Sequence, residues 1–224
     1  MIPLKDDVPT RTFPIITIGI VLVNIFIFAW SLTLPAGLER SLVQKYAFIP
    51  RDLMVALASR IDLLPYNVMT IFTSMFIHGG FLHIGGNMLY LWIFGNNVED
   101  AAGHMRFAVF YLLSGVAAGL VQYSFDPSSP VPMVGASGAV SGVLGAYLIL
   151  FPRAKVKTLI FVFLFITTID IPAMVLLTVW FFVQIAFSHG QGGVAWFAHI
   201  GGFIFGMLTV KIFARRRPKT RVAW

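Results

Sequence analysis

The sequence contains no cysteine. This absence excludes a disulfide framework, a thiolate metal site and a cysteine nucleophile. Charge is also scarce, since Asp, Glu, Lys and Arg together make up 11% of the chain and only 9 residues are acidic. No H-E-x-x-H motif for zinc occurs, and no two aspartates fall within long apolar runs where they could share a proton. We therefore expect neither a metal ion nor a cofactor.

Hydrophobic residues make up 58% of the 224 positions, and several apolar runs approach the length that crosses a bilayer. These features predict a polytopic membrane protein in contact with the lipid bilayer. The formal net charge of +7 could suggest nucleic acid binding. However, the basic residues cluster at the chain end and beside the apolar runs, as topology signals do. We expect no nucleic acid partner and interpret the charge as orientation.

The apolar runs predict an all-α bundle of six transmembrane helices, at about 14–34, 81–97, 107–124, 135–151, 172–188 and 194–213. Two spans within 158–187 are an alternative, but they would place the basic tail outside, against the positive-inside tendency. We favour one span there, with the piece before Pro172 dipping into the bilayer or lying along it. The expected organisation is a cytoplasmic segment 1–13, a membrane domain 14–213 and a basic cytoplasmic tail 214–224.

The stretch Gly135-Ala-Ser-Gly-Ala-Val-Ser-Gly142 places a hydroxyl, that of Ser137, among residues with very small side chains. One interpretation is packing alone, because small residues at helical spacing let helices approach closely in lipid. The other is a functional serine, approached by a second helix through the glycine-rich face. The pattern of the remaining polar residues decides between these two interpretations.

His199 falls near the start of the last predicted helix, at roughly 8 Å below the outer boundary by helical rise. Gly202 and Gly206 share its helical face, and Ser137 begins a helix that starts from the same side of the membrane. An ionisable side chain at that depth indicates a functional site, although a purely structural histidine is the alternative. A serine hydrogen-bonded to an imidazole is an activated nucleophile, so we predict a Ser137–His199 dyad.

His83 and Asn87 are spaced i, i+4 and therefore share a face of the second predicted helix at the same depth. Donors placed there would stabilise an oxyanion, together with the N–H groups of the helix that begins at Ser137. The alternative is a polar pair that only joins helices. Glu99, Asp126 and Asp170 are predicted away from this depth, so no carboxylate completes a triad.

Four sequence features together resemble the rhomboid intramembrane serine proteases. They are G-A-S-G around Ser137, H-x-x-x-N at His83 and Asn87, A-H-x-x-G-x-x-x-G from Ala198 to Gly206, and N-x-V-E-D-x-x-G from Asn96 to Gly103. The resemblance covers about 67–207. It implies a six-helix core, Ser137 as nucleophile, His199 as general base, and His83, Asn87 and the Ser137 N–H as oxyanion hole. It also implies that the substrates are transmembrane proteins, cut near the outer end of their helix.

Ser141 stands where some members of that family carry an aromatic residue against the histidine, so we expect a more mobile imidazole. Trp180 and Gln184, spaced i, i+4, are interpreted as interhelical packing and hydrogen bonding.

Two other classes of membrane protein are alternatives to the protease. A non-catalytic rhomboid-like protein that binds and escorts membrane proteins would be expected to lack the nucleophile or the base. A transporter would continue its polar path to the inner face, where the sequence is apolar apart from glycine and Thr209. The expected location is a prokaryotic plasma membrane with both termini cytoplasmic, because no transit-like leader or soluble domain is seen. Neither the oligomeric state nor the physiological substrate follows from the sequence.

Overall fold

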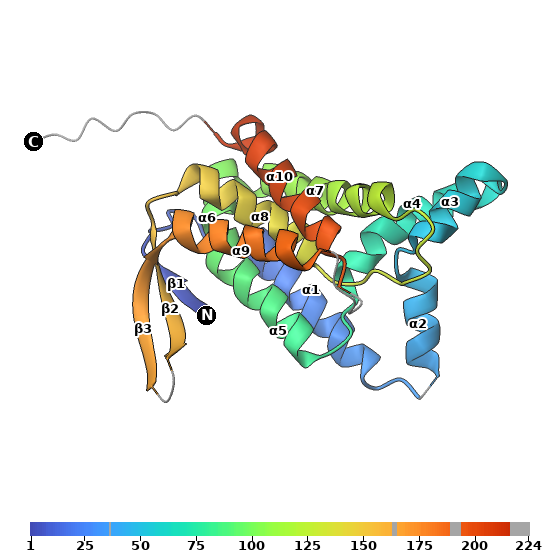
Figure 1. Cartoon of the computed structure of the whole chain (residues 1–224), viewed down its shortest axis with the longest axis horizontal. Helices are drawn as coiled ribbons and strands as arrows, with labels where there is room; N and C mark the ends of the chain where they lie inside the picture. Colours follow the sequence, from blue (N-terminus) through green and yellow to red (C-terminus); the bar gives the residue numbers. More distant parts are fainter. Residues whose placement is uncertain (36, 163–164, 189–193, 216–224) are drawn as a thin grey trace, which may run out of the picture.

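The structure, a computed structural model, describes residues 1–35, 37–162, 165–188 and 194–215. It is mostly helical, as predicted (Figure 1). The helices of the bundle are α1 Ile15–Ser31, α5 Phe81–Tyr90, α6 Asn96–Ala102, α7 His104–Phe125, α8 Ser137–Leu150, α9 Ala173–Phe187 and α10 Trp196–Phe213. A π-helical segment, Leu91–Gly95, joins α5 to α6.

The helix bounds agree closely with the apolar runs in the sequence. Within the described residues, α7 and α10 are long and apolar enough to cross a membrane alone. The helix from Phe81 to Ala102 passes the same test together with Ile61–Phe76, from which it is bent by 85°. α1, α8 and α9 are apolar but shorter. These elements are consistent with the six-helix bundle expected from the sequence.

Short helices form the loop between α1 and α5 and lie together at one end of the bundle (Figure 1, right). They are α2 Leu38–Tyr46, α3 Pro50–Ala58 and α4 Leu64–Thr73, with 3-10 turns at Ile61–Leu63 and Ser74–Phe76. Proline stands in the first turn of both α3 and α4. Backbone N–H groups in a first turn have no acceptor within the helix, so proline removes no hydrogen bond there. With 9 or 10 residues each, these helices are too short to span a bilayer.

A three-stranded antiparallel sheet, which the sequence analysis did not predict, lies at the other end of the bundle (Figure 1, left). Its strands, in spatial order, are β1 Ile2–Asp6, β2 Lys155–Val162 and β3 Phe165–Pro172. The expectation that the piece before Pro172 simply lies along or dips into the bilayer was therefore incomplete. Its alternating β-branched residues form a hairpin, and the N-terminal segment adds the third strand.

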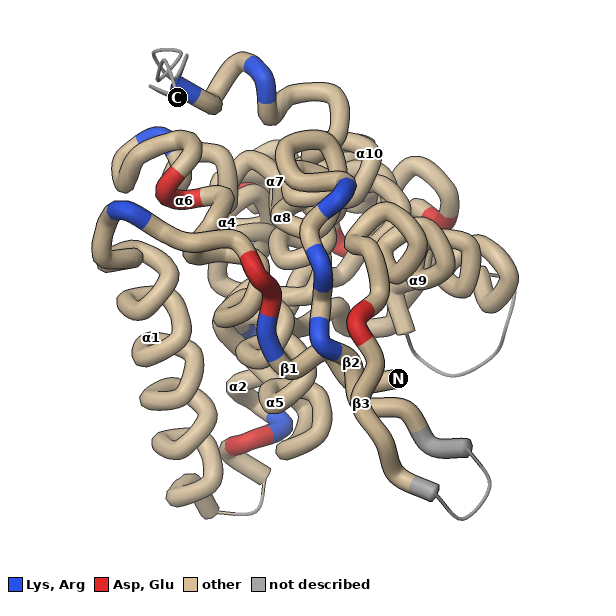
Figure 2. The backbone as a smooth tube through the Cα atoms, turned by 90° about the vertical axis from the view of Figure 1, so that its left-hand side faces the viewer, with Lys and Arg blue, Asp and Glu red and all other residues tan. Residues whose placement is uncertain are grey.

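Charged residues concentrate on this sheet and in the connections at the helix ends (Figure 2). Lys157 on β2 is the cross-strand partner of Asp170 on β3 and of Lys5 on β1. By contrast α1 carries no charge along its length. Of the expected basic tail, only 214–215 belong to the described residues, and the remainder lies outside them.

Glu99 on α6 ties the start of α1 to the bundle. Its carboxylate is fully buried and accepts hydrogen bonds from the N–H of Ile16 at 3.0 Å and the N–H and hydroxyl of Thr17 at 2.8 and 2.7 Å. His104 Nδ1 lies 2.5 Å from the same carboxylate. A buried carboxylate needs such partners, and here it offsets the positive end of the α1 dipole.

Helices α8 and α10 pack backbone against backbone along a row of glycines. A Cβ added at Gly202 would overlap the carbonyl of Gly138, and one at Gly206 would overlap the carbonyl of Gly142. Gly145 meets the carbonyl of Phe203 in the same way. Only glycine permits this approach, which brings the first turns of α8 and α10 together.

Candidate active site

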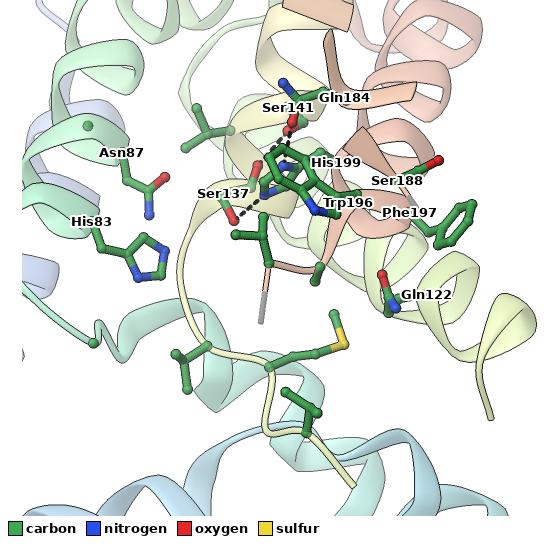
Figure 3. A pocket seen from close by; sticks show the side chains of 18 of the residues that line it. His83, Asn87, Gln122, Ser137, Ser141, Gln184, Ser188, Trp196, Phe197 and His199 are labelled. Atoms are coloured by element: carbon green, nitrogen blue, oxygen red, sulfur yellow. Dashed lines mark hydrogen bonds between the residues drawn. The ribbon is translucent and has the colours of Figure 1, made fainter. Parts of the chain in front are cut away.

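Ser137 and His199 lie side by side where α8 and α10 begin (Figure 3). The Ser137 Oγ is 2.8 Å from Nε2 of His199, a normal hydrogen-bond distance. The two residues are 62 positions apart in the chain, and the glycine row described above joins the helices that carry them. A hydroxyl bonded to an imidazole has a general base in place for proton removal.

The second nitrogen of the imidazole is held by α9. His199 Nδ1 lies 2.8 Å from Oε1 of Gln184 (Figure 3), and the Trp180 ring centroid is 6.2 Å from that of the imidazole. From the sequence, Gln184 and Trp180 were expected to make interhelical contacts, and the imidazole of His199 was expected to be mobile. The contacts are interhelical, but they end on His199 itself, so the imidazole has a partner at each nitrogen. The sequence signal for these contacts was the i, i+4 spacing of Trp180 and Gln184 on the fifth predicted helix.

His83 and Asn87 project from α5 toward the segment that leads into Ser137 (Figure 3). Gly135 in that segment has φ of +114°, and a Cβ there would lie 2.5 Å from His83 Nε2 and 3.4 Å from Asn87 Nδ2. A glycine is therefore required both by the backbone conformation and by space. The backbone just before Ser137 thus runs directly past the two side chains.

His78 links Asn87 on α5 to the backbone that precedes Ser137. Its Nε2 lies 3.0 Å from Asn87 Nδ2 and accepts from the Ala136 N–H at 3.4 Å. The His78 and His83 rings meet edge to face with centroids 5.1 Å apart. His78 therefore orients the amide of Asn87, and the sequence pattern gave no sign of this contact.

The four residues predicted as the site line one cavity of about 940 Å³. Its wall includes apolar side chains of α8 and α9, among them Val140, Leu144 and Trp180. Within the described part of the chain, no three His, Cys, Asp or Glu side chains are grouped so that they could hold a metal ion. The four predicted residues bring a hydroxyl, two imidazoles and an amide into this cavity, and Asp126 is the acidic side chain among its lining residues.

Comparisons with known proteins show the family to which the chain belongs. The family model of the rhomboid domain matches residues 65–216. The chain is 31% identical over 175 residues to "Rhomboid protein 1, mitochondrial" of Saccharomyces cerevisiae, which covers 74% of this chain and 44% of that protein. It is 32% identical over 135 residues to "Rhomboid protease GluP" of Bacillus subtilis, which covers 60% of this chain and 24% of that protein.

A third relative is the human "Presenilin-associated rhomboid-like protein, mitochondrial", 27% identical over 222 residues, covering 91% of this chain and 51% of that protein. The chain thus spans about half or less of the length of these three relatives. Mitochondrial proteins stand among them beside a bacterial one, so the expectation of a prokaryotic plasma membrane is not supported. With a matched domain that covers most of the membrane bundle, the chain belongs to the rhomboid family of integral membrane proteins.

Proposed function

We propose that the protein is an intramembrane serine endopeptidase that cleaves transmembrane segments of other membrane proteins. The observation that carries the proposal is the 2.8 Å contact between Ser137 Oγ and His199 Nε2. A second support is the relative named "Rhomboid protease GluP". The site residues are Ser137 as nucleophile and His199 as general base and acid.

The reaction begins when the Ser137 hydroxyl attacks the scissile carbonyl carbon while its proton passes to His199 Nε2. The tetrahedral intermediate then collapses, and the protonated imidazole gives that proton to the leaving amine. Water next loses a proton to His199 and attacks the acyl-enzyme ester, releasing the new carboxylate and restoring the Ser137 hydroxyl. The dyad thus returns to its starting state with no cofactor.

The negative oxygen of the intermediate needs donors that are already in place. We assign this role to His83, Asn87 and the N–H of Ser137. The first-turn N–H groups of α8 have no carbonyl one turn earlier in the helix, and the positive end of the helix dipole lies there. Asn87 gives one amide hydrogen to His78, and the amide nitrogen carries a second.

The segments that join the helices indicate how the bundle is oriented in a membrane. The charged sheet and the α6–α7 turn lie at one end of the bundle, and the candidate site lies toward the other end. Because Lys and Arg favour the cytoplasmic side, we place the sheet and both termini there and the catalytic cavity near the outer face. A substrate helix would then be cut near its outer end, where it can unwind.

The alternative remains a rhomboid-like protein that binds and escorts membrane proteins without cutting them. Labelling by a fluorophosphonate probe separates the two, because it requires an activated serine and no known substrate. The assay compares wild type, Ser137→Ala and His199→Ala in liposomes, with cleavage of a single-span test substrate measured in parallel.

Ser124→Ala is the matched control, since Ser124 is an exposed serine on α7 that only donates to the Leu120 carbonyl. We expect labelling and cleavage to disappear in both dyad variants and to persist in the control. Cleavage that survives Ser137→Ala would overturn the assignment. A folded wild type that neither labels nor cleaves would favour the escort function.

A further inference from the structure

Gln184 is the buried polar residue of α9, with a side chain that is 5% exposed. Between Leu177 and the end of α9, the other side chains are partly or fully exposed, as Phe182 and Phe187 are. Its amide nitrogen donates to the Trp180 carbonyl at 3.1 Å, and its amide oxygen lies 2.8 Å from His199 Nδ1. A polar side chain in this apolar helix is therefore directed at the imidazole.

These two contacts fix which way the amide faces. A backbone carbonyl can only accept, so the nitrogen of Gln184 must face Trp180 and the oxygen must face the imidazole. His199 Nδ1 must then carry the proton, because an amide oxygen has none to give. The other ring nitrogen, Nε2, is consequently the acceptor for the Ser137 hydroxyl. The Gln184 amide thus selects the one neutral tautomer that can act as a base toward Ser137.

We propose that Gln184 is a positioning residue that holds His199 in the tautomer and ring orientation required by the dyad. This inference rests on the proposed function. It gives Gln184 the place that a carboxylate occupies in Ser-His-Asp triads, with a neutral carbonyl oxygen as the acceptor. In an apolar helix this substitution has a physical reason, because burying a carboxylate carries a large desolvation cost that an amide avoids.

The competing explanation is that Gln184 only joins α9 to α10. Two substitutions distinguish the alternatives. Gln184→Met has nearly the same length and suits an apolar helix, but it has no strong acceptor for Nδ1–H. Gln184→Glu keeps a carboxyl oxygen at the same position, whether or not the group is ionised. Thr209→Val is the matched control, since it removes a side-chain hydrogen bond to the Phe205 carbonyl from α10, distant from the cavity.

The experiment measures kcat and KM for a single-span test substrate, the rate of fluorophosphonate labelling, and the thermal unfolding midpoint of each variant in detergent. For Gln184→Met we expect kcat and the labelling rate to fall together by roughly 10- to 100-fold, the value of one lost orienting hydrogen bond. KM and the unfolding midpoint should change no more than in Thr209→Val. Gln184→Glu should recover most of the lost rate.

Wild-type rates in Gln184→Met would overturn the inference and leave the proposed function standing. A loss of rate in both Gln184 variants that follows a lowered unfolding midpoint would also overturn it, because it would show a purely structural contact. Absence of labelling in wild type would instead refute the proposed function. The failures of the two proposals are therefore distinguishable.

Discussion

Gly206 on α10 lies so close to Gly142 on α8 that a methyl group on Gly206 would overlap the Gly142 carbonyl. The neighbouring pair, Gly202 and Gly138, is equally close. The relationship matters for the candidate site because it sets the separation of the two helices that carry Ser137 and His199. The glycine row that packs α8 against α10 and the Ser137–His199 contact are thus parts of one interface.

Gly206→Ala should force α8 and α10 apart. Overpacking of this kind costs about 1–3 kcal/mol, so we expect a lower free energy of unfolding and weaker serine labelling. Unfolding by denaturant in detergent micelles measures the first effect, and probe labelling the second. The control is Gly19→Ala on α1, where an added Cβ meets nothing within 4 Å. Equal stability of the two variants would contradict the close-packing argument.

Gly135→Ala should affect catalysis more than stability. The residue combines a φ of +114° with a Cβ position 2.5 Å from His83 Nε2, so alanine would push the imidazole away. Gly37→Ala is a matched comparison, because Gly37 has φ of +104° with open space around it. Both variants should lose about 1–3 kcal/mol of stability from backbone strain. Only Gly135→Ala should lose labelling, and a parallel loss in Gly37→Ala would show that strain alone is responsible.

His83→Ala removes a proposed oxyanion donor. Donors of this kind act in the transition state, so we expect kcat to fall by about 10²- to 10³-fold while KM stays nearly constant. Steady-state cleavage of a single-span substrate in liposomes provides both constants. A rise in KM at unchanged kcat would instead assign His83 to substrate binding.

Glu99→Gln should destabilise the fold and leave the chemistry of folded molecules intact. The carboxylate accepts from Ile16, Thr17 and His104, and an amide that replaces it brings donors where acceptors are needed. Leaving buried partners unsatisfied costs about 1–3 kcal/mol each. The exposed Glu39 on α2 supplies the control variant, Glu39→Gln, which should unfold like wild type. Unchanged stability in Glu99→Gln would show that the contact with α1 is dispensable.

Asp6 should give the protein a pH-dependent stability. Burial raises the pKa of this carboxyl above its ordinary value of 3.8, although a hydrogen bond from Tyr147 opposes the shift. The folded state then binds the proton more tightly than the unfolded state, so this group's contribution to stability falls as the pH rises from about 3.8 through the raised pKa. Unfolding followed across this range should show that decline in wild type and a smaller one in Asp6→Asn. Identical profiles would remove Asp6 as its source.

The apolar runs located the long helices well. A long apolar segment in lipid must pair its own backbone N–H and C=O groups, and an α-helix does so within the segment. The hairpin β2–β3 was missed for a related reason. Its residues 158–171 are as apolar as a helix that enters lipid, and hydropathy alone does not separate the two. The β-branched residues at Thr158, Thr167 and Thr168 were the signal for strands. The partner strand from Ile2 could not be foreseen, since pairing between distant segments leaves no local pattern.

For the candidate site, the amino-acid sequence by itself determined the residue types, the helices on which Ser137 and His199 lie, and the family to which the motifs point. Helical spacing and membrane length are local properties, so the sequence carries them directly. Only the tertiary structure decided that Gln184 reaches the second nitrogen of His199 and that Gly135 passes against His83. Those contacts depend on how helices distant in the chain are rotated against one another, which side-chain packing across the whole bundle fixes.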